Sequence, residues 1–490
     1  MDLQFRTISE EEFADYARAV EAAFSEVPTD EDLERERRLA VLDRCFGAFD
    51  GAEIVGTTAL LPIPMALPGN EIEVGYVTAV GVKPTHRRRG INAELMRRQV
   101  EDGHERGDLV HVLYASEGGI YGRYGYGVAT FGLALDVESA RAAFVRGYER
   151  SGSVRLVESE AAVADVLAVH EVVRPSRPGM VKLDAVSLEY SLHEHGPARD
   201  APRFFVVHQG VGGVDGYAIY RVRHDWSGGV PRSTLTVRDL QAVSPGAYAD
   251  LWRFVFDVDL TEQVQAWNRP VDDALMHLVR EPRRLRATLR DNLWLRLVDV
   301  PEALRARRYA SAGRLVLEVR DPFCPWNDGR YALEASADGL GVAERVSAEP
   351  DIACSVNEVG AVYLGGSTFR ALHRAGRVLE ERPGGSRSRR RDVRVGSGAL
   401  VPVRVLSAGQ VSPRTTSMAP SAPSPTASVS ERIRRNRRLT RWAPAPSSTM
   451  AESDSETPAR SAATVRKASS RPPSNAASAT TAAPVVARNT

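Results

Sequence analysis

Residues 77–93 read Val-Thr-Ala-Val-Gly-Val-Lys-Pro-Thr-His-Arg-Arg-Arg-Gly-Ile-Asn-Ala, and this stretch decides both the fold and the candidate site. The apolar, β-branched run up to Val82 indicates a strand, Pro84 a turn, and Gly90 the start of a helix. The N–H groups of a first helical turn have no partner inside the helix, and the helix dipole is positive there. We call residues 83–90 the basic loop, and we expect it to bind an anion.

The anion predicted at the basic loop belongs to an elongated ligand. Gly90 would let a pyrophosphate approach the backbone, while the strand edge at residues 80–82 would pair with an extended arm that carries amides. Coenzyme A has both parts. An Arg-x-x-Gly pattern alone is weak, because three arginines at a helix start are usually a solvated face. The strand that precedes it favours the functional interpretation.

A second glycine-rich segment, residues 116–127, follows the next predicted strand and is called the tyrosine loop. Five of its last ten residues are glycine, which keeps the backbone open beside a ligand. Packing is the favoured interpretation of Tyr124 and Tyr126. If an amine takes an acetyl group from coenzyme A, a thiolate leaves, and the phenol of Tyr121 is a suitable proton donor.

The chain divides into four segments, residues 1–150, 151–300, 301–382 and 383–490. Strands are expected at 45–49, 54–61, 72–82 and 109–115, after a helix whose capping box is Ser9 with Glu12. Further strands are expected at 204–208, 217–222, 315–319 and 331–335, followed by a helical stretch over 359–373. This order predicts an α/β sheet with a ligand crevice near the basic loop. Residues 383–490 lack hydrophobic periodicity, and their composition predicts disorder.

A formal net charge of +1 conceals an acidic body and a basic tail. Residues 383–490 hold 18 of the 64 basic and 5 of the 63 acidic residues, a balance of +13. The remaining 46 basic and 58 acidic residues give residues 1–382 a balance of −12. An acidic body attracts cations such as polyamines, basic peptides or aminoglycosides, although it equally serves solubility.

Cysteine usage and hydropathy indicate the compartment. The three cysteines, Cys45, Cys324 and Cys354, are scattered, which fits a reducing cytoplasm and argues against a disulfide framework and a zinc site. No apolar run approaches the ~20 residues of a membrane helix, and the N-terminus lacks a signal-peptide pattern. We therefore expect a cytoplasmic protein without a metal or a membrane partner.

With these motifs the chain resembles the GNAT superfamily, and within it the enhanced intracellular survival (Eis) N-acetyltransferases. The resemblance is carried by residues 79–90, 115–130, 291–301 and 362–366. It implies an α/β (α+β) architecture of two tandem GNAT folds, of which only the first binds acetyl-CoA, followed by a sterol-carrier-protein-like domain. It also implies a homohexamer that moves acetyl from acetyl-CoA to an amine of an aminoglycoside or a lysine side chain.

The resemblance also implies roles for particular residues. Tyr121 would be the general acid. The base of the family is the carboxylate of the chain's own C-terminus, which in this sequence is formally Thr490. By position, the residues that would contact acetyl-CoA are Val80, Gly81, Val82, Arg88, Arg89, Gly90, Ile91, Asn92, Ala93, Ser116 and Glu117.

The tail departs from the family pattern, because family members end soon after the segment that matches residues 377–383. Only three of the 64 basic residues are lysine, which suggests coding DNA rich in G and C. With such codons, residues 385–406 can be read one base later as an amphipathic helix that ends in Tyr-Gly-Phe before a stop. A frameshift would explain the abrupt change. It would also leave Thr490 on a flexible tail, at low effective concentration near the site.

Three functions remain open. The leading one is an N-acetyltransferase, and the second is a catalytically weak acyl-CoA binder that lacks its base. Thiol release from acetyl-CoA separates these two. The third is an apolar-ligand carrier built on residues 322–326, for which aromatic packing is the commoner explanation. Arginines at 432–441 would bind phosphate non-specifically, but in an out-of-frame tail this affinity is accidental, so no nucleic-acid partner is expected.

Overall fold

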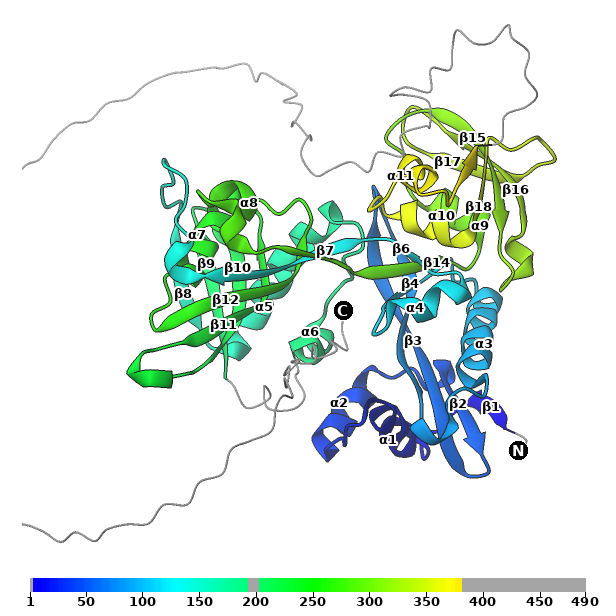
Figure 1. The fold of residues 1–490 in the computed structure, drawn as a ribbon, viewed down its shortest axis with the longest axis horizontal. Coiled ribbons are helices and arrows are strands. Elements are labelled where there is room, and N and C mark those ends of the chain that lie inside the picture. Colours follow the sequence, from blue (N-terminus) through cyan, green and yellow to red (C-terminus); the bar gives the residue numbers. More distant parts are fainter. Residues whose placement is uncertain (1–2, 193–201, 381–490) are drawn as a thin grey trace, which may run out of the picture. The chain divides into compact units, whose positions relative to one another are not determined.

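The computed structural model describes residues 3–192 and 202–380, and the strands of these residues form three sheets (Figure 1). The first sheet has the order β1-β2-β3-β4-β5-β14-β6. Strands β1 to β4 are antiparallel neighbours, whereas β5 runs parallel to β4. The bounds are β1 (Gln4–Thr7), β2 (Cys45–Asp50), β3 (Glu53–Leu67), β4 (Asn70–Val82), β5 (Val110–Tyr114), β14 (Leu293–Leu297) and β6 (Gly127–Val128).

Helices cover both faces of the first sheet. Ile54 and Val55 are consecutive on β3, so their side chains point to opposite faces. Ile54 packs against α1 (Phe13–Phe24), whereas Val55 packs with residues of α3 (Ile91–Arg106). A further helix, α2 (Asp30–Leu39), follows α1. The first sheet with these helices is called the first domain.

The predicted capping box of α1 forms only in part. The Ser9 backbone N–H donates to the Glu12 carboxylate at 2.9 Å, as such a box requires. The Ser9 hydroxyl, however, donates to Glu11, and Glu12 itself is the N-cap residue, without a side-chain cap. The helix therefore begins at Phe13, with its apolar stripe facing the sheet as the spacing predicts.

The second sheet has the order β13-β7-β12-β11-β10-β9-β8 and, with its helices, forms the second domain. The strands are β7 (Phe131–Glu138), β8 (Ser153–Val157), β9 (Arg203–Gly210), β10 (Gly213–Arg223), β11 (Ser233–Ala242), β12 (Thr261–Pro270) and β13 (Thr288–Asp291). The helices are α5 (Ser159–Val173), α6 (Ala185–Leu192), α7 (Pro245–Phe256) and α8 (Leu275–Leu278).

The first two sheets exchange strands. β7 lies in the second sheet, between β13 and β12, although it precedes residue 150. β14 lies in the first sheet, between β5 and β6, although it directly precedes residue 300. The expected boundary at residue 150 therefore does not separate the first two sheets, and residues 151–300, expected to form the second domain, contribute β14 to the first sheet. Local patterns reveal that a segment is a strand but not which sheet it joins, because pairing is decided by tertiary contacts.

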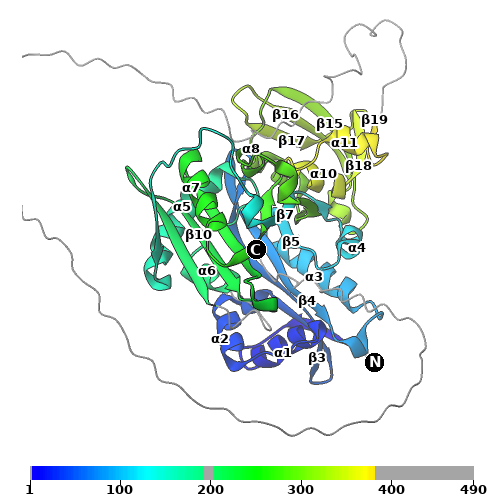
Figure 2. The ribbon, with the colours of Figure 1, turned by 60° about the vertical axis from the view of Figure 1, so that its left-hand side comes forward.

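The third sheet has the order β17-β16-β15-β18-β19 and, with its helices, forms the third domain (Figures 1 and 2). The strands are β15 (Gly313–Arg320), β16 (Gly329–Ala335), β17 (Gly341–Arg345), β18 (Ile352–Ser355) and β19 (Leu379–Glu380). The helices are α9 (Val300–Ala306), α10 (Val356–Tyr363) and α11 (Phe369–Arg374). The single helical stretch predicted over 359–373 is thus two helices, separated by a segment that contains Gly365 and Gly366.

The first and third domains share one core. Val74 and Leu295 of the first sheet lie in the same buried cluster as Leu317 of β15 and Val359 of α10. The third domain is therefore packed against the sheet that carries the basic loop. Residues 383–490, for which disorder is expected, lie outside the described residues.

Candidate active site

The first feature of the candidate site is an unpaired strand edge. β4 and β5 are parallel but pair at only two positions, Gly75 with His111 and Tyr76 with Val112. β4 continues to Val82 while it remains paired with β3 on its other side. Within the described residues, positions 77–82 thus have no partner strand on the β5 side. Their backbone groups on that side can pair with the amides of an extended ligand.

A bulge in β4 reorients this edge. The register between β3 and β4 shifts between Thr57 and Ala59, and Ala79 opposite has a φ of +53°. The Thr57 hydroxyl, which is fully buried, donates to the carbonyl oxygen of Ala79 at 2.7 Å and so stabilises this conformation. A bulge turns backbone groups out of the regular ladder. The sequence carried no signal for Thr57, because its role depends on a neighbouring strand.

The basic loop ends at the N-terminus of α3, where no side chain caps the helix. Arg88 and Gly90 have φ values of +63° and +81°, and Gly90 is the N-cap of α3, without any side-chain cap. A Cβ added at Gly90 would meet nothing within 4 Å, so the glycine is required by the backbone conformation and the space in front of it is open. Uncapped N–H groups beside open space form the anion site that the sequence predicts.

The three arginines of the basic loop have different tasks. Arg87 donates to the carbonyl oxygens of Val82 at 3.2 Å and Ala23 at 2.7 Å, so it ties the loop to β4 and α1. Arg89 donates to the carbonyl oxygen of Thr85 at 3.2 Å. Arg88 is exposed, and no hydrogen bond or ion pair engages its side chain within residues 3–192 and 202–380. Arg88 is therefore the cation available to a ligand.

Three segments meet beside the tyrosine loop. Val80 from β4, Ala115 after β5 and Tyr121 at the end of α4 (Gly118–Tyr121) belong to one apolar cluster. Asn92, in the first turn of α3, donates to the Tyr124 hydroxyl at 3.4 Å, and its own Oδ1 atom is buried without a partner. The structure thus brings the strand edge, the helix start and the tyrosine loop together. The unpartnered Asn92 oxygen fits a ligand that can donate a hydrogen bond.

Burial does not distinguish the three tyrosines, but their hydroxyl groups differ. Tyr121 is only 5% exposed, and burial raises its pKa to about 12, while a hydrogen bond with Ser116 and the neighbouring Glu117 also act on it. Its hydroxyl therefore lies beside two of the residues predicted to contact the cofactor. The Tyr126 hydroxyl is buried without a partner, and burial raises its pKa as well. Of the three tyrosines, Tyr121 is the one whose hydroxyl lies beside Ser116 and Glu117, whereas the Tyr124 hydroxyl accepts from Asn92.

The remaining predicted site residues occupy three different environments. Ile91 is buried and packs in one cluster with Leu95 and Val82, so only its backbone is free to meet a ligand. Ala93 is exposed on α3. Gly81 pairs with Thr57 of β3. Thr490 lies outside the described residues.

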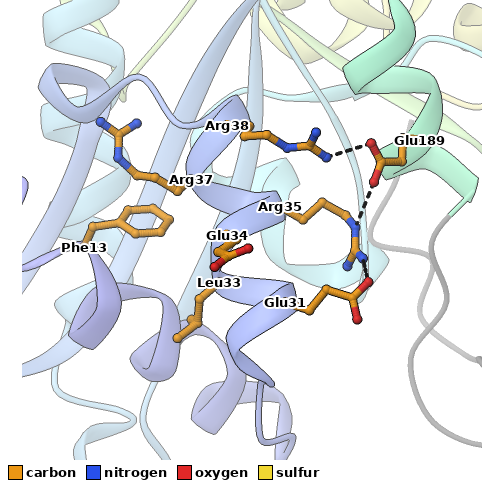
Figure 3. A pocket seen from close by; sticks show the side chains of 8 residues that line it. All are labelled: Phe13, Glu31, Leu33, Glu34, Arg35, Arg37, Arg38 and Glu189. Carbon is orange, nitrogen blue, oxygen red and sulfur yellow. Dashed lines mark hydrogen bonds and ion pairs between the residues drawn. The ribbon is translucent and has the colours of Figure 1, made fainter.

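A surface hollow between α2 and α6 contains none of the predicted site residues (Figure 3). Arg35 pairs there with Glu31 at 2.7 Å and lies 3.7 Å from Glu189, which also pairs with Arg38 at 2.7 Å. Figure 3 shows that the two contacts with Glu189 cross from α2 to α6, whereas the pair of Arg35 with Glu31 lies within α2. The hollow is therefore a junction between the first and second domains, and the open helix N-terminus remains the better anion site.

Two further observations concern metals and membranes. Across residues 3–192 and 202–380, no group of three or more His, Cys, Asp or Glu side chains is arranged to hold a metal ion. No helix in the same residues has the length and apolar character needed to cross a membrane.

Comparisons with known proteins extend over all three domains. Residues 4–129 and residues 179–297 match two family models, each described as an acetyltransferase (GNAT) domain, and residues 300–392 match a sterol carrier protein domain. An uncharacterised N-acetyltransferase of Streptomyces avermitilis is 41% identical over 362 residues, which are 72% of this chain and 87% of that protein. N-acetyltransferase Eis of Mycobacterium tuberculosis is 35% identical over 347 residues, which are 68% of this chain and 81% of Eis.

A solved structure agrees with the sequence comparisons. The crystal structure of Eis1 from Mycobacterium abscessus has a TM-score of 0.67 and 34% identity, and the match covers 78% of this chain and 94% of Eis1. The parallel strands that separate at the basic loop, together with the matched domains, define a GNAT N-acetyltransferase. The chain belongs to the Eis family of these enzymes. The expected series of two GNAT folds and a sterol-carrier-like domain is confirmed.

Proposed function

We propose that the chain transfers acetyl from acetyl-CoA to an amine of a cationic acceptor, either an aminoglycoside or a lysine side chain. The observation that supports this most directly is the meeting of the unpaired β4 edge, the open N-terminus of α3 and the buried Tyr121. These three features match the amide-bearing arm, the pyrophosphate and the leaving thiolate of one ligand. The acidic balance of residues 1–382 supports a cationic acceptor.

Each site residue has a task in this proposal. The backbone of residues 80–82 pairs with the pantetheine arm, and the N–H groups of Gly90, Ile91, Asn92 and Ala93 bind the pyrophosphate beside Arg88 and Arg89. Ser116 and Glu117 border the thioester end. Acetyl-CoA supplies the acetyl group as a reactive thioester. Tyr121 stays protonated at neutral pH because burial raises its pKa to about 12, so it is available as the general acid.

The proton balance involves both ends of the reaction. A bond forms between the amine nitrogen and the acetyl carbon, the carbon–sulfur bond breaks, and the sulfur takes the proton of Tyr121. The amine gives its own proton to a base, and the Tyr121 phenolate regains a proton through solvent, so that the turnover has no net gain or loss of protons. By resemblance this base is the C-terminal carboxylate, formally Thr490, and without it the proton goes to water or to another carboxylate.

A second candidate function is that of a catalytically weak acyl-CoA binder. The match with Eis1 covers 94% of Eis1 but only 78% of this chain, so a long segment has no counterpart there. A binder would keep the basic loop and lack only the base. The apolar-carrier interpretation of residues 322–326 gains no support, because Cys324 is buried and the Phe323 ring lies 5.3 Å from that of Tyr124.

Thiol release from acetyl-CoA tests the proposal. The protein is mixed with acetyl-CoA and with each member of a panel of aminoglycosides and lysine peptides. Thiol should appear only when an amine is present, together with an N-acetylated product seen by mass spectrometry. Acetyl-CoA binding without thiol release from any amine would establish the binder instead. The proposal also includes a location in the cytoplasm and a homohexameric state. Analytical ultracentrifugation of the purified chain would detect or refute the hexamer.

A further inference from the structure

The third domain contacts the tyrosine loop through one side-chain amide. Asn357 lies in the first turn of α10, and its Nδ2 atom donates to the carbonyl oxygens of Gly122 at 2.7 Å and Tyr126 at 2.8 Å. Gly122 directly follows Tyr121 in the sequence. One amide of the sterol-carrier-like domain therefore holds both ends of the segment that follows the proposed general acid.

A buried ion pair holds the middle of the same segment. Arg296 of β14 donates to the carbonyl oxygen of Tyr124 and pairs with Asp321 of the third domain at 2.6 Å. Both side chains of this pair are completely buried. The Tyr124 ring also packs against Phe323, with 5.3 Å between ring centroids. The third domain thus makes the carbonyl contacts at residues 122 and 126, and through Asp321 it pairs with the arginine that makes the contact at residue 124.

Close backbone packing prevents the tyrosine loop from moving independently of α10. A Cβ added at Gly127 would lie 1.9 Å from the carbonyl oxygen of Asn357 and 2.7 Å from the backbone nitrogen of Ala361. Only a glycine permits α10 to approach β6 this closely. The end of the tyrosine loop therefore rests directly on the helix that carries Asn357.

The clamped segment in turn encloses Tyr121. The Tyr126 N–H donates to the carbonyl oxygen of Tyr121 at 3.3 Å. The two rings meet edge to face, with centroids 6.0 Å apart and an angle of 72° between their planes. A shift of the Tyr126 backbone would therefore move the ring that supports Tyr121. A displacement of about 1 Å at a reacting group can cost roughly 10²-fold in rate.

We propose that Asn357 is a positioning residue, through which the sterol-carrier-like domain fixes the Tyr121 hydroxyl for proton donation. This inference rests on the proposed role of Tyr121. It gives the third domain a task in the first domain's chemistry that does not depend on where the chain ends. Asn357 acts through the backbone of the tyrosine loop and does not need to touch either substrate.

The test uses Asn357→Asp in the full chain. This substitution keeps the size of the side chain, and a negative charge in the first turn of α10 favours the helix dipole, so the fold should persist. The substitution removes the amide that donates both hydrogen bonds. It also places a carboxylate beside the carbonyl oxygens of Gly122 and Tyr126. We expect kcat to fall at least tenfold while KM for acetyl-CoA changes less than twofold. Asn357→Ala, which adds no charge, should lower kcat in the same direction.

Asn70→Asp provides the matched control. Asn70 also donates from its side-chain amide to a backbone oxygen of the third domain, that of Ala306 at 2.6 Å, but it lies at the start of β4, at the opposite end of that strand from the basic loop. Its variant should retain kcat. If Asn70→Asp and Asn357→Asp lower kcat equally, the effect is one of general domain packing and the inference is wrong. Unchanged kcat in both Asn357 variants would also overturn it.

A double-mutant cycle with Tyr121→Phe separates this inference from the proposed function. If Asn357 acts through the Tyr121 hydroxyl, Asn357→Asp should have no further effect on kcat in the Tyr121→Phe background. Equal effects of Asn357→Asp in both backgrounds would overturn the positioning role. If Tyr121→Phe alone leaves kcat unchanged, the proposed function of Tyr121 fails, whatever Asn357 does.

Discussion

In each GNAT domain one helix connects two parallel strands, and the N-termini of these two helices differ. In the first domain, α3 begins after Gly90, which provides no side-chain cap. In the second domain, α7 begins after Ser244, whose hydroxyl accepts the N–H of Ala247 at 3.1 Å, and its first residue is Pro245, which has no N–H. One N-terminus therefore keeps its donors for a ligand, whereas the other has lost one donor and capped another.

The edges of the parallel strands beside these helices, β4 and β11, also differ between the two domains. β11 and β12 are parallel and pair from Ser233 as far as Val237 with Ala266. Beyond that point Arg269 of β12, which is buried, donates to the carbonyl oxygen of Leu240 on β11 at 2.9 Å. In the first domain the corresponding edge, residues 77–82, has no partner strand within the described residues, and side chains bind two of its carbonyl oxygens, those of Ala79 and Val82. We propose that the Ser244 cap and Arg269 close the equivalent site of the second domain while the fold is retained.

The largest effect that would sharpen this comparison is expected from Tyr121→Phe. The variant keeps the ring but removes the donor, so kcat should fall about 10²- to 10⁴-fold with little change in acetyl-CoA binding. Tyr126→Phe should cost far less, because the hydroxyl it removes has no partner. Tyr248→Phe removes a buried hydroxyl of the second domain that donates to Asp273, and it should leave kcat unchanged. Steady-state kinetics of the three variants would show whether the chemistry belongs to the first domain alone.

The second prediction concerns pH. Because burial raises the pKa of Tyr121 to about 12, this acid remains protonated below that value and causes no loss of rate between pH 7 and 9. A lysine amine has a pKa of about 10.4, so its neutral fraction rises roughly tenfold per pH unit in this range. Without a docked base, kcat/KM should therefore rise about 100-fold from pH 7 to pH 9.

A chain that ends in the alternative reading of residues 385–406 is the control for this pH profile. Its free terminal carboxylate should raise the rate at pH 7 and flatten the profile, and amidation of that terminus should abolish the gain, because an amide does not accept the proton. Equal rates and profiles for both chains would show that the carboxylate is unnecessary. Resequencing the gene tests the frameshift itself.

The third prediction is a change in cofactor affinity. Arg88→Glu places a negative charge beside the proposed pyrophosphate site, so the acetyl-CoA Kd should rise at least tenfold, which corresponds to about 1.4 kcal/mol. Arg232→Glu changes the net charge equally at an exposed arginine of the second domain and should leave Kd unchanged. Calorimetry that finds the same Kd for Arg88→Glu as for the parent chain would remove the basic loop from the site.

Local patterns were sufficient for several strands of each sheet. The strands expected at 45–49, 72–82 and 331–335 agree with β2, β4 and β16 to within a few residues, because alternation and turn residues are local properties. The exchange of β7 and β14 could not be foreseen. Neither segment was among the strands expected from the sequence, and only contacts between distant residues decide which sheet each one joins.

The sequence likewise indicated some residues of the candidate site and not others. The basic loop and Tyr121 stood out because their residue types carry chemistry at a recognisable spacing. The sequence did not show that Arg87 is bound to Val82 and Ala23 while Arg88 is available, because three adjacent arginines look alike in one dimension. Nor did it indicate Asn357, whose contacts with Gly122 and Tyr126 span more than 200 positions in the chain.

The smallest expected effect is on the free energy of unfolding, when the N-cap residue of α7, Ser244, or that of α3, Gly90, is replaced. Ser244→Ala removes the hydroxyl that accepts the Ala247 N–H, and the free energy of unfolding should fall by about 1 kcal/mol. Gly90→Ala meets no steric obstacle, but its φ of +81° costs a residue with a Cβ roughly 1–2 kcal/mol. The two variants should therefore have similar stabilities by denaturant titration.

Only Gly90→Ala should also weaken acetyl-CoA binding, because only its new methyl group faces the proposed pyrophosphate. Ser244→Ala frees an N–H group at α7, yet we expect calorimetry to find one acetyl-CoA per chain, as in the parent. The reason is that Arg269 still donates to the Leu240 carbonyl and occupies the strand edge that a pantetheine arm would need. If Ser244→Ala instead gained a second acetyl-CoA site, the cap alone would be what closes the second domain, and the role given to Arg269 would be wrong.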